Sequence, residues 1–162
     1  MASNLLKVSL LSLLIPLSAC NADSSKASKS VTPAVTKAAA PIKQAGGYSN
    51  IDNETLKNLI AEGKVVLVDI RRQEEWQQTG IVKGSKTITF FDNMGRINPN
   101  FVPEFTAIAK PNQTIALICR TGSRSQAASQ AIAQQLGYKN VLNVTHGITG
   151  WMAEKRPVVK YK

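Results

Sequence analysis

The chain has 162 residues, of which 43% are hydrophobic, and a formal net charge of +10. This length suits one domain with a single core. The 20 basic and 10 acidic residues form no long run of like charge, which argues against nucleic-acid binding and favours attraction to an anionic membrane surface or to small anionic substrates.

The first 20 residues are typical of an export signal. Lys7 is their only charge, the apolar stretch 8–17 is too short to span a bilayer, and small residues precede Cys20. Leu17-Ser18-Ala19-Cys20 resembles a bacterial lipobox, which implies cleavage before Cys20 and lipidation of that cysteine. We therefore expect a lipoprotein signal peptide over residues 1–19 and an exported, periplasm-facing protein that is anchored to a membrane by lipid.

Residues 20–47 consist mainly of Ser, Ala, Lys, Thr and Pro and contain no aromatic side chain. Such a composition cannot bury a core, so we expect a disordered tether after the lipidated cysteine. Asn21 directly after Cys20 favours the outer over the inner membrane. The alternative is an ordinary signal peptide that releases a soluble protein.

From residue 48 to residue 162 short apolar runs alternate with helical patterns. The expected elements, in chain order, are a helix from Asp52 to about Gly63, a strand at 65–68, a helix at 73–78, a strand at 87–90, a loop at 92–103, a helix at 104–109, a strand at 114–118, a helix at 123–136, a strand at 140–144 and a helix at 147–153. This alternation predicts one α/β domain over 48–162, with a parallel sheet flanked by helices on both faces.

The stretch Cys119-Arg120-Thr121-Gly122-Ser123-Arg124-Ser125 joins the strand at 114–118 to the helix that follows. Cys119 is thereby placed at the carboxyl end of a strand, the edge where open α/β sheets bind ligands. Backbone N–H groups of the turn, the positive end of the helix and two arginines would all favour the reactive thiolate. The stretch therefore predicts a nucleophile in an anion-binding loop, and the alternative is an inert buried cysteine.

Several motifs, in the same order, resemble those of the rhodanese-like sulfurtransferases. The Cys119 loop is similar to the family's active-site loop, Val68-Asp69-Ile70-Arg71 with Glu75-Trp76 is similar to its "D-x-R…E-[FWY]", and Gly84-Ser85-Lys86-Thr87-Ile88 to its "G-A-x-N-I". Residues 137–151 resemble its closing "G-[FY]-x-N-V…G-G-I-x-x-W". Ile81 and His146 depart from the His of "G-H-I" and the first Gly of "G-G-I".

The resemblance implies a single rhodanese-like domain in which Cys119 carries a persulfide. Sulfur would pass from a small anionic donor such as thiosulfate to cyanide or a thiol, including the thiol of a protein, without a cofactor. The residues expected to bind the anion are Arg120, Thr121, Gly122, Ser123, Arg124 and Ser125. Asp69 and Arg71 are supporting candidates, expected mainly to hold neighbouring backbone together.

Two other classes of function use similar residues. Cysteine phosphatases and arsenate reductases resemble one another in having five residues between Cys and Arg, whereas four separate Cys119 from Arg124, which favours a smaller ring suited to one sulfur atom. Asp92 is the nearest candidate for the general acid that a phosphatase needs. The remaining alternative is a non-catalytic module that binds an anion or a partner protein.

Metal and acid–base candidates are few. One His and two Cys in unrelated segments do not make a metal site. His146 is the single histidine and hence a candidate general base, although sulfur transfer to a thiolate needs no base.

Overall fold

A computed structural model describes residues 38–162. The expected signal peptide, Cys20 and most of the expected tether lie outside these residues. The strands are β1 (Ile42–Lys43), β2 (Ser49–Ile51), β3 (Val66–Asp69), β4 (Lys86–Thr87), β5 (Ile115–Ile118) and β6 (Val141–Val144). The helices are α1 (Asn53–Ala61), α2 (Gln73–Thr79), α3 (Phe101–Ile108), α4 (Ser123–Gln135) and α5 (Gly147–Ala153).

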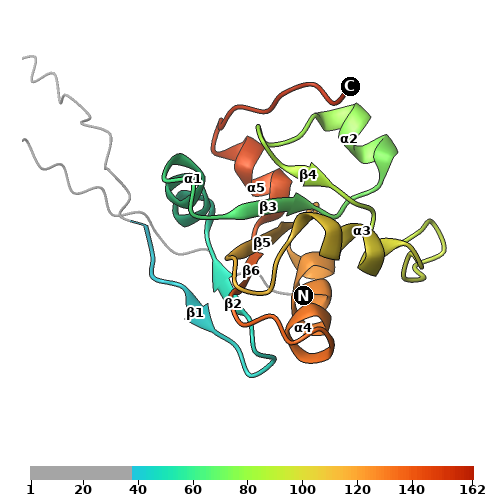
Figure 1. Ribbon diagram of the computed structural model, residues 1–162. Helices are drawn as coiled ribbons and strands as arrows, with labels where there is room; N and C mark the ends of the chain where they lie inside the picture. The colour runs from blue at the N-terminus through green and yellow to red at the C-terminus, as the bar shows by residue number, and fades with distance from the viewer. Residues whose placement is uncertain (1–37) are drawn as a thin grey trace, which may run out of the picture. The chain divides into compact units, whose positions relative to one another are not determined.

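The strands form one sheet in the order β1-β2-β6-β5-β3-β4 (Figure 1). Every neighbouring pair is parallel except β1 and β2, which pair antiparallel at one edge. The predicted parallel α/β fold is therefore confirmed, with one antiparallel edge strand. The sequence did not indicate β1 or β2, because both are short and neither forms an apolar run; β1 lies within the segment expected to be a tether.

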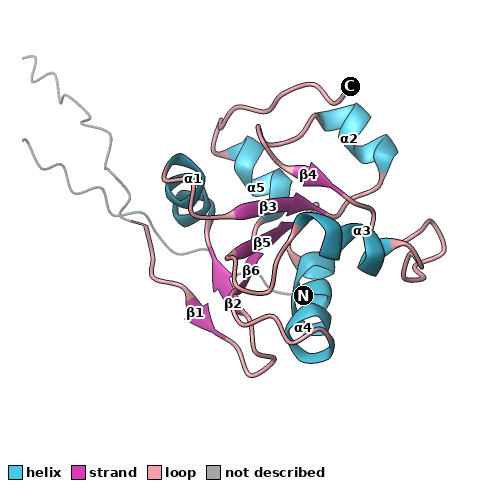
Figure 2. Cartoon of the chain, viewed as in Figure 1, coloured by secondary structure: helices cyan, strands magenta, loops and turns pink. Residues whose placement is uncertain are grey.

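Helices cover both faces of the sheet, as Figure 2 shows. Successive strand residues alternate between the faces: Leu117 packs into the core under α3 and α4, while Ala116 and Ile118 pack into the core under α1 and α5. Strands buried on both sides need a continuous apolar run, which is why β5 was predictable from Ile115-Ala116-Leu117-Ile118 alone.

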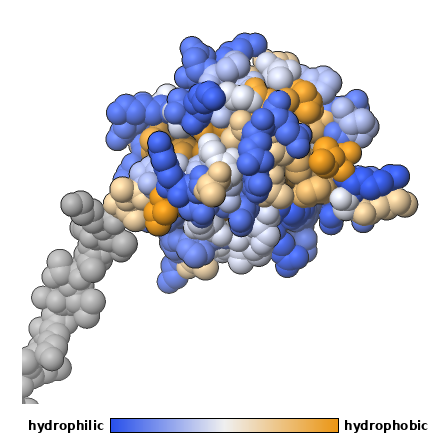
Figure 3. Space-filling model, turned by 90° about the horizontal axis from the view of Figure 1, so that it is seen from below, coloured by the Kyte–Doolittle hydropathy of each residue, from blue (hydrophilic) through white to orange (hydrophobic). Residues whose placement is uncertain are grey.

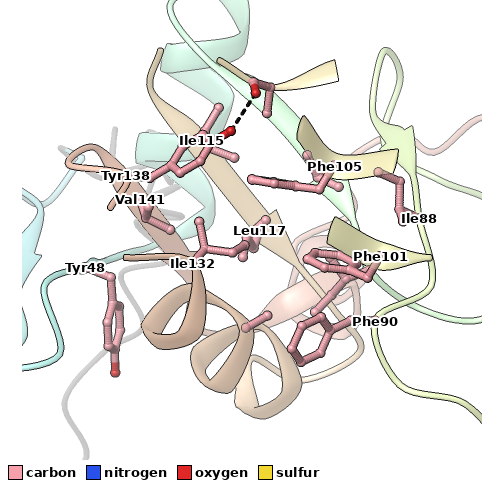
Figure 4. Close-up of a cluster of buried hydrophobic side chains, with 14 of the residues drawn as sticks. Tyr48, Ile88, Phe90, Phe101, Phe105, Ile115, Leu117, Ile132, Tyr138 and Val141 are labelled. Atoms are coloured by element: carbon pink, nitrogen blue, oxygen red, sulfur yellow. Dashed lines mark hydrogen bonds between the residues drawn. The ribbon is translucent and has the colours of Figure 1, made fainter. Parts of the chain in front are cut away.

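The core under α3 and α4 is built around aromatic side chains (Figure 4). Phe90 meets the ring of Phe101 edge to face at 4.7 Å between centroids, and Phe105 stacks on Phe101 at 5.4 Å. The Tyr138 hydroxyl is buried and donates to the Ala109 carbonyl at 2.8 Å. Ala128 and Ile132 of α4 pack into this core, which positions the helix. The Cys119 loop leads directly into the first turn of α4.

Two elements differ most from their predicted bounds. The strand expected at 87–90 has only two ladder residues, Lys86 and Thr87, although Ile88 and Phe90 still donate to the Asp69 and Ile70 carbonyls. Helix α3 begins at Phe101 instead of residue 104, because Pro103 lies in its first turn, where no N–H group is needed.

Exposed apolar side chains are scattered among polar ones on the face that Figure 3 shows. The large ones on the described surface are Ile42, Met94, Ile97, Val102 and Val159. Among residues 38–162, none of the helices has the length and apolar character that a bilayer crossing requires.

Candidate active site

The Cys119 loop lies at the carboxyl edge of the sheet, between the loops that follow β3 and β6 (Figure 1). Strand β5 pairs with both of these strands, and its last residue, Ile118, is in register with Asp69. Three chain segments therefore meet around the sulfur: the loop itself, the start of α2 after β3, and the start of α5 after β6. The prediction that Cys119 lies at the carboxyl edge of the sheet is therefore confirmed.

Cys119 is buried, with 1% of its surface exposed. Its Sγ accepts a hydrogen bond from the Gly122 N–H at 3.1 Å and lies 3.4 Å from the Ser125 Oγ. The N–H groups of Thr121, Ser123 and Arg124 donate to no acceptor within residues 38–162. The loop thus offers one N–H to the sulfur and keeps further N–H groups free for an anion, beside the positive end of α4.

Two glycines allow the surrounding backbone to approach the loop closely. Gly122 has φ of +102°, and a Cβ there would collide with the Thr145 carbonyl. Gly147 has φ of +55°, and a Cβ there would collide with the carbonyls of Cys119 and Arg120. These contacts explain why the loop needs Gly122 and why the start of α5 needs Gly147.

The close approach allows backbone N–H groups of α5 to form hydrogen bonds with the loop. The Ile148 N–H donates to the Cys119 carbonyl at 2.9 Å, and the Thr149 N–H donates to the Arg120 carbonyl at 3.0 Å. These N–H groups belong to the first turn of α5 and have no partner within the helix, so the two loop carbonyls satisfy them.

Arg124 forms a two-pronged ion pair with Glu75, the third residue of α2. Its two terminal nitrogens donate to the two carboxylate oxygens at 2.8 and 2.6 Å. Burial alone would raise the pKa of Glu75, but hydrogen bonds from Arg124 and from the Arg72 N–H, with the Arg124 charge, lower it to about 2. The Arg124 charge is therefore largely committed to a structural contact that the sequence did not indicate.

Arg120, in contrast, is exposed, and its side chain has no hydrogen bond or ion pair within the described part of the chain. It borders a cavity of about 250 Å³ beside the loop, whose other walls come from α2 and α5. Gln78 and Thr79 line it on one side, and Thr149 and Met152 on the other. A small anion in this cavity would meet the Arg120 guanidinium, whose residue directly follows Cys119 in the chain.

Asp69 and Arg71 are almost completely buried and bind each other. The Arg71 guanidinium donates to Asp69 Oδ1 at 2.9 Å and to Asp69 Oδ2 at 2.7 Å. It also donates to the Thr79 hydroxyl and the Gly80 carbonyl. The pair thus ties the end of β3 to the far end of α2. This contact holds in place the helix that presents Glu75 to Arg124.

The other candidates lie in ordinary structural positions. His146 is the exposed residue that precedes α5. The Asp92 carboxylate accepts from the Met94 and Arg96 N–H groups and from the Arg96 side chain in an exposed turn, so it is occupied within its own loop. Among the residues described, no cluster of three His, Cys, Asp or Glu side chains suited to a metal ion occurs.

Sequence reasoning missed two asparagines behind the sulfur. Asn143 in β6 is 2% exposed, accepts from the Ser125 hydroxyl at 2.7 Å and donates to the Asn50 side chain in β2 at 2.9 Å. The signal was available: Asn143 is the one polar residue in the apolar strand Val141-Leu142-Asn143-Val144, and a buried amide must find partners.

Comparisons with known proteins identify the class of protein that has such a cysteine loop at the carboxyl edge of a mostly parallel α/β sheet. The family model described as "Rhodanese-like domain" matches residues 52–154. The chain therefore belongs to the rhodanese-like domain family.

Individual relatives agree with this assignment. An uncharacterised protein of Rickettsia prowazekii, RP600, is 39% identical over 95 residues, covering 57% of this chain and 76% of the relative. A protein of Allochromatium vinosum named "Sulfurtransferase" is 30% identical over 112 residues, covering 68% of this chain and 94% of the relative. The crystal structure of a rhodanese-related protein from Thermoplasma volcanium superposes with a TM-score of 0.56 at 28% identity, covering 69% of this chain and 98% of that one.

Proposed function

We propose that this protein is a sulfurtransferase that carries sulfane sulfur as a persulfide on Cys119. The observation that carries the proposal is the environment of Sγ: a buried sulfur that accepts the Gly122 N–H, in a loop with further unpaired N–H groups. Those groups stabilise an anion without any side-chain movement. The relative from Allochromatium vinosum that bears the name sulfurtransferase supports the same activity.

The reaction would proceed in two displacements. The Cys119 thiolate attacks the outer sulfur of thiosulfate, a sulfur–sulfur bond forms, and sulfite leaves with the electron pair of the broken bond. Cyanide or an acceptor thiolate then attacks the outer sulfur of the persulfide, and the Cys119 thiolate leaves with its electron pair. The uncommitted Arg120 beside the cavity would attract the anionic donor.

Mass spectrometry of the intact protein tests this function. Treatment with thiosulfate should add the mass of one sulfur atom, and subsequent cyanide should remove it. Cys119→Ser should gain no sulfur and should transfer none to cyanide, while its circular dichroism spectrum stays that of the unmodified protein. A wild-type protein that gains no sulfur from thiosulfate would leave the proposal without its intermediate.

We further propose that the domain works at a membrane surface in the periplasm, held there by lipid on Cys20. The support is the lipobox-like Leu17-Ser18-Ala19-Cys20 and the core-free composition of the segment that follows.

A further inference from the structure

Behind the Cys119 sulfur runs a chain of neutral polar side chains that the proposed reaction does not use. Ser125 lies next to Sγ, Asn143 lies next to Ser125, and Asn50 lies next to Asn143. Ser125 and Asn143 are 0% and 2% exposed, so water does not replace their partners. Three elements each supply one member: the consecutive α4 and β6, and β2, which lies far from both in the sequence.

The Ser125 hydroxyl has one proton and three possible acceptors. The Asn143 Oδ1 is nearest at 2.7 Å, the Gly122 carbonyl is 3.0 Å away, and the Cys119 Sγ is 3.4 Å away. When the proton points to Asn143, a lone pair of Ser125 faces the sulfur. That arrangement suits a neutral sulfur and opposes an anionic one.

The chain can also run in the opposite direction. An amide has an acceptor and a donor of nearly the same shape, so a half-turn of Asn143 would present its NH₂ group to Ser125 and its oxygen to Asn50. A matching half-turn of Asn50 would supply the donor to that oxygen. Ser125 would then accept from Asn143 and donate its own proton to the sulfur, and among the heavy atoms only the amide oxygen and nitrogen of each asparagine would exchange places.

The charge on Sγ must change in every reaction cycle of the proposed kind. Sγ is anionic as the thiolate, and it becomes a neutral bridging sulfur when the negative charge passes to the outer sulfur of the persulfide. A fixed hydrogen-bond donor would stabilise only the first state. A hydrogen-bond chain whose direction can reverse would stabilise both charge states of Sγ. It would thereby lower the free-energy barrier of each displacement.

We propose that Asn143, backed by Asn50, is a positioning residue that turns the Ser125 hydroxyl toward the Cys119 sulfur when this sulfur is anionic and away from it when it is neutral. The catalytic role of this hydrogen-bond chain rests on the proposed function, whereas its effect on the thiol does not. The free protein tests it through ionisation of the thiol, without any sulfur transfer.

Charged side chains around the loop also influence ionisation of the Cys119 thiol. The charged and titratable side chains on the surrounding elements are those of Asp69, Arg71, Glu75, Arg120, Arg124 and His146. Within residues 38–162 none of them hydrogen-bonds to Ser125, Asn143 or Asn50. Neutral substitutions in the chain therefore leave this field unchanged.

The experiment follows the ultraviolet absorbance of the thiolate against pH in the full chain carrying Cys20→Ser, so that Cys119 is the only thiol. Cys119→Ser in the same background supplies the blank. Ser125→Ala removes the donor and should move the ionisation midpoint up by about one pH unit, a roughly tenfold loss of thiolate at fixed pH. Asn143→Asp, whose carboxylate can only accept, should hold the Ser125 proton and give a rise of similar size.

Three further variants separate the proposal from simpler explanations. Ser129→Ala removes a buried serine hydroxyl one turn further along α4, which has no partner among the described residues, and should leave the midpoint unchanged. Asn143→Leu removes the group that turns Ser125 and leaves its proton to the Gly122 carbonyl, 3.0 Å away, so it should raise the midpoint by up to the amount seen for Ser125→Ala. In the Ser125→Ala background, Asn143→Asp should lose most of its effect, because Asn143 acts through the hydroxyl.

The proposal fails if Ser125→Ala titrates like the unmodified protein. It also fails if Asn143→Asp shifts the midpoint equally with and without the Ser125 hydroxyl, since a bare charge effect would then suffice. If Asn143→Asp does not fold, Asn143→Leu decides by itself: a midpoint equal to that of the unmodified protein overturns the proposal. Sulfur transfer that is absent while these shifts are present would refute the proposed function and leave the hydrogen-bond chain intact.

Discussion

Arg124 and Glu75 bind each other through two parallel hydrogen bonds of 2.8 and 2.6 Å, joining the first turn of α4 to the first turn of α2. The two residues are 49 positions apart in the sequence, and each is partly buried. This pair distinguishes the two loop arginines: Arg124 ties the loop to α2, whereas the exposed Arg120 has no ion pair within residues 38–162. Such a difference could not be deduced from the sequence, in which both arginines follow Cys119 within the same short loop.

The first prediction concerns stability in acid. The pKa of Glu75 is lowered to about 2 in the folded protein from an ordinary value of 4.5, so its contribution is fully present above about pH 4.5 and is lost as the pH falls toward 2. Glu75→Gln should cost about 1–2 kcal/mol at neutral pH, allowing for partial exposure of the pair, and should flatten the loss of stability in that acid range. Urea unfolding at several pH values measures both effects.

Glu104→Gln is the matched control for this prediction. Glu104 is an exposed glutamate in the first turn of α3 and has no ion pair within residues 38–162. Its substitution should leave stability at neutral pH close to that of the unmodified protein. Equal stability of the Glu75 and Glu104 variants would contradict a structural role for the Arg124 pair.

The second prediction separates the two arginines by kinetics. Arg120→Ala should raise the KM for thiosulfate roughly tenfold with little change in stability, because a charge-assisted contact to the ligand is lost from an exposed side chain. Arg124→Ala should instead lower stability, because Glu75 loses its partner. Steady-state transfer of sulfur to cyanide and thermal unfolding distinguish the two outcomes.

Arg96→Ala controls for the loss of one positive charge. Arg96 is exposed and pairs with Asp92 in the turn before α3. It should leave the KM for thiosulfate within about twofold, since surface charge pairs of this kind contribute little. A rise in KM as large as that of Arg120→Ala would mean that net charge, and not the Arg120 position, attracts the donor.

The third prediction is selectivity for sulfur over phosphate. Gly122 closes the loop by donating directly to Sγ, only three residues after Cys119, which leaves a small ring. The nearest general-acid candidate, Asp92, is engaged by Met94 and Arg96. The protein should therefore transfer sulfur from thiosulfate and hydrolyse an aryl phosphate no faster than Cys119→Ser does. Hydrolysis that depends on Cys119, with no persulfide detected, would favour the phosphatase alternative.

The fourth prediction concerns the membrane. In a bacterial host with lipoprotein processing, the protein should be found in the membrane fraction, and Cys20→Ala should block processing or release it. Mass spectrometry of the amino-terminal peptide should detect acyl chains on Cys20. A soluble wild-type protein with an unmodified Cys20 would contradict lipid anchoring.

Local sequence determined most of the fold and the position of Cys119 between a strand and a helix. The buried run Ile115-Ala116-Leu117-Ile118 and the helix-favouring stretch after Gly122 predicted strand and helix on either side of Cys119, and both were confirmed. Apolar periodicity and turn residues are local signals, and they suffice when an element is long and buried on both sides. Strands β1 and β2 were missed because two or three residues at a sheet edge leave too little of a pattern.

The partners of the site residues were decided only by the tertiary structure. Glu75 was known to begin a helix, and Asn143 to lie in a strand, but their contacts with Arg124 and Ser125 span 49 and 18 residues. A hydrogen bond between such residues depends on which strand ends the sheet order brings together, and no local pattern specifies that order. The packing of β3, β5 and β6 side by side turns a recognisable cysteine loop into a site with one committed arginine, one free arginine and a polar chain behind the sulfur.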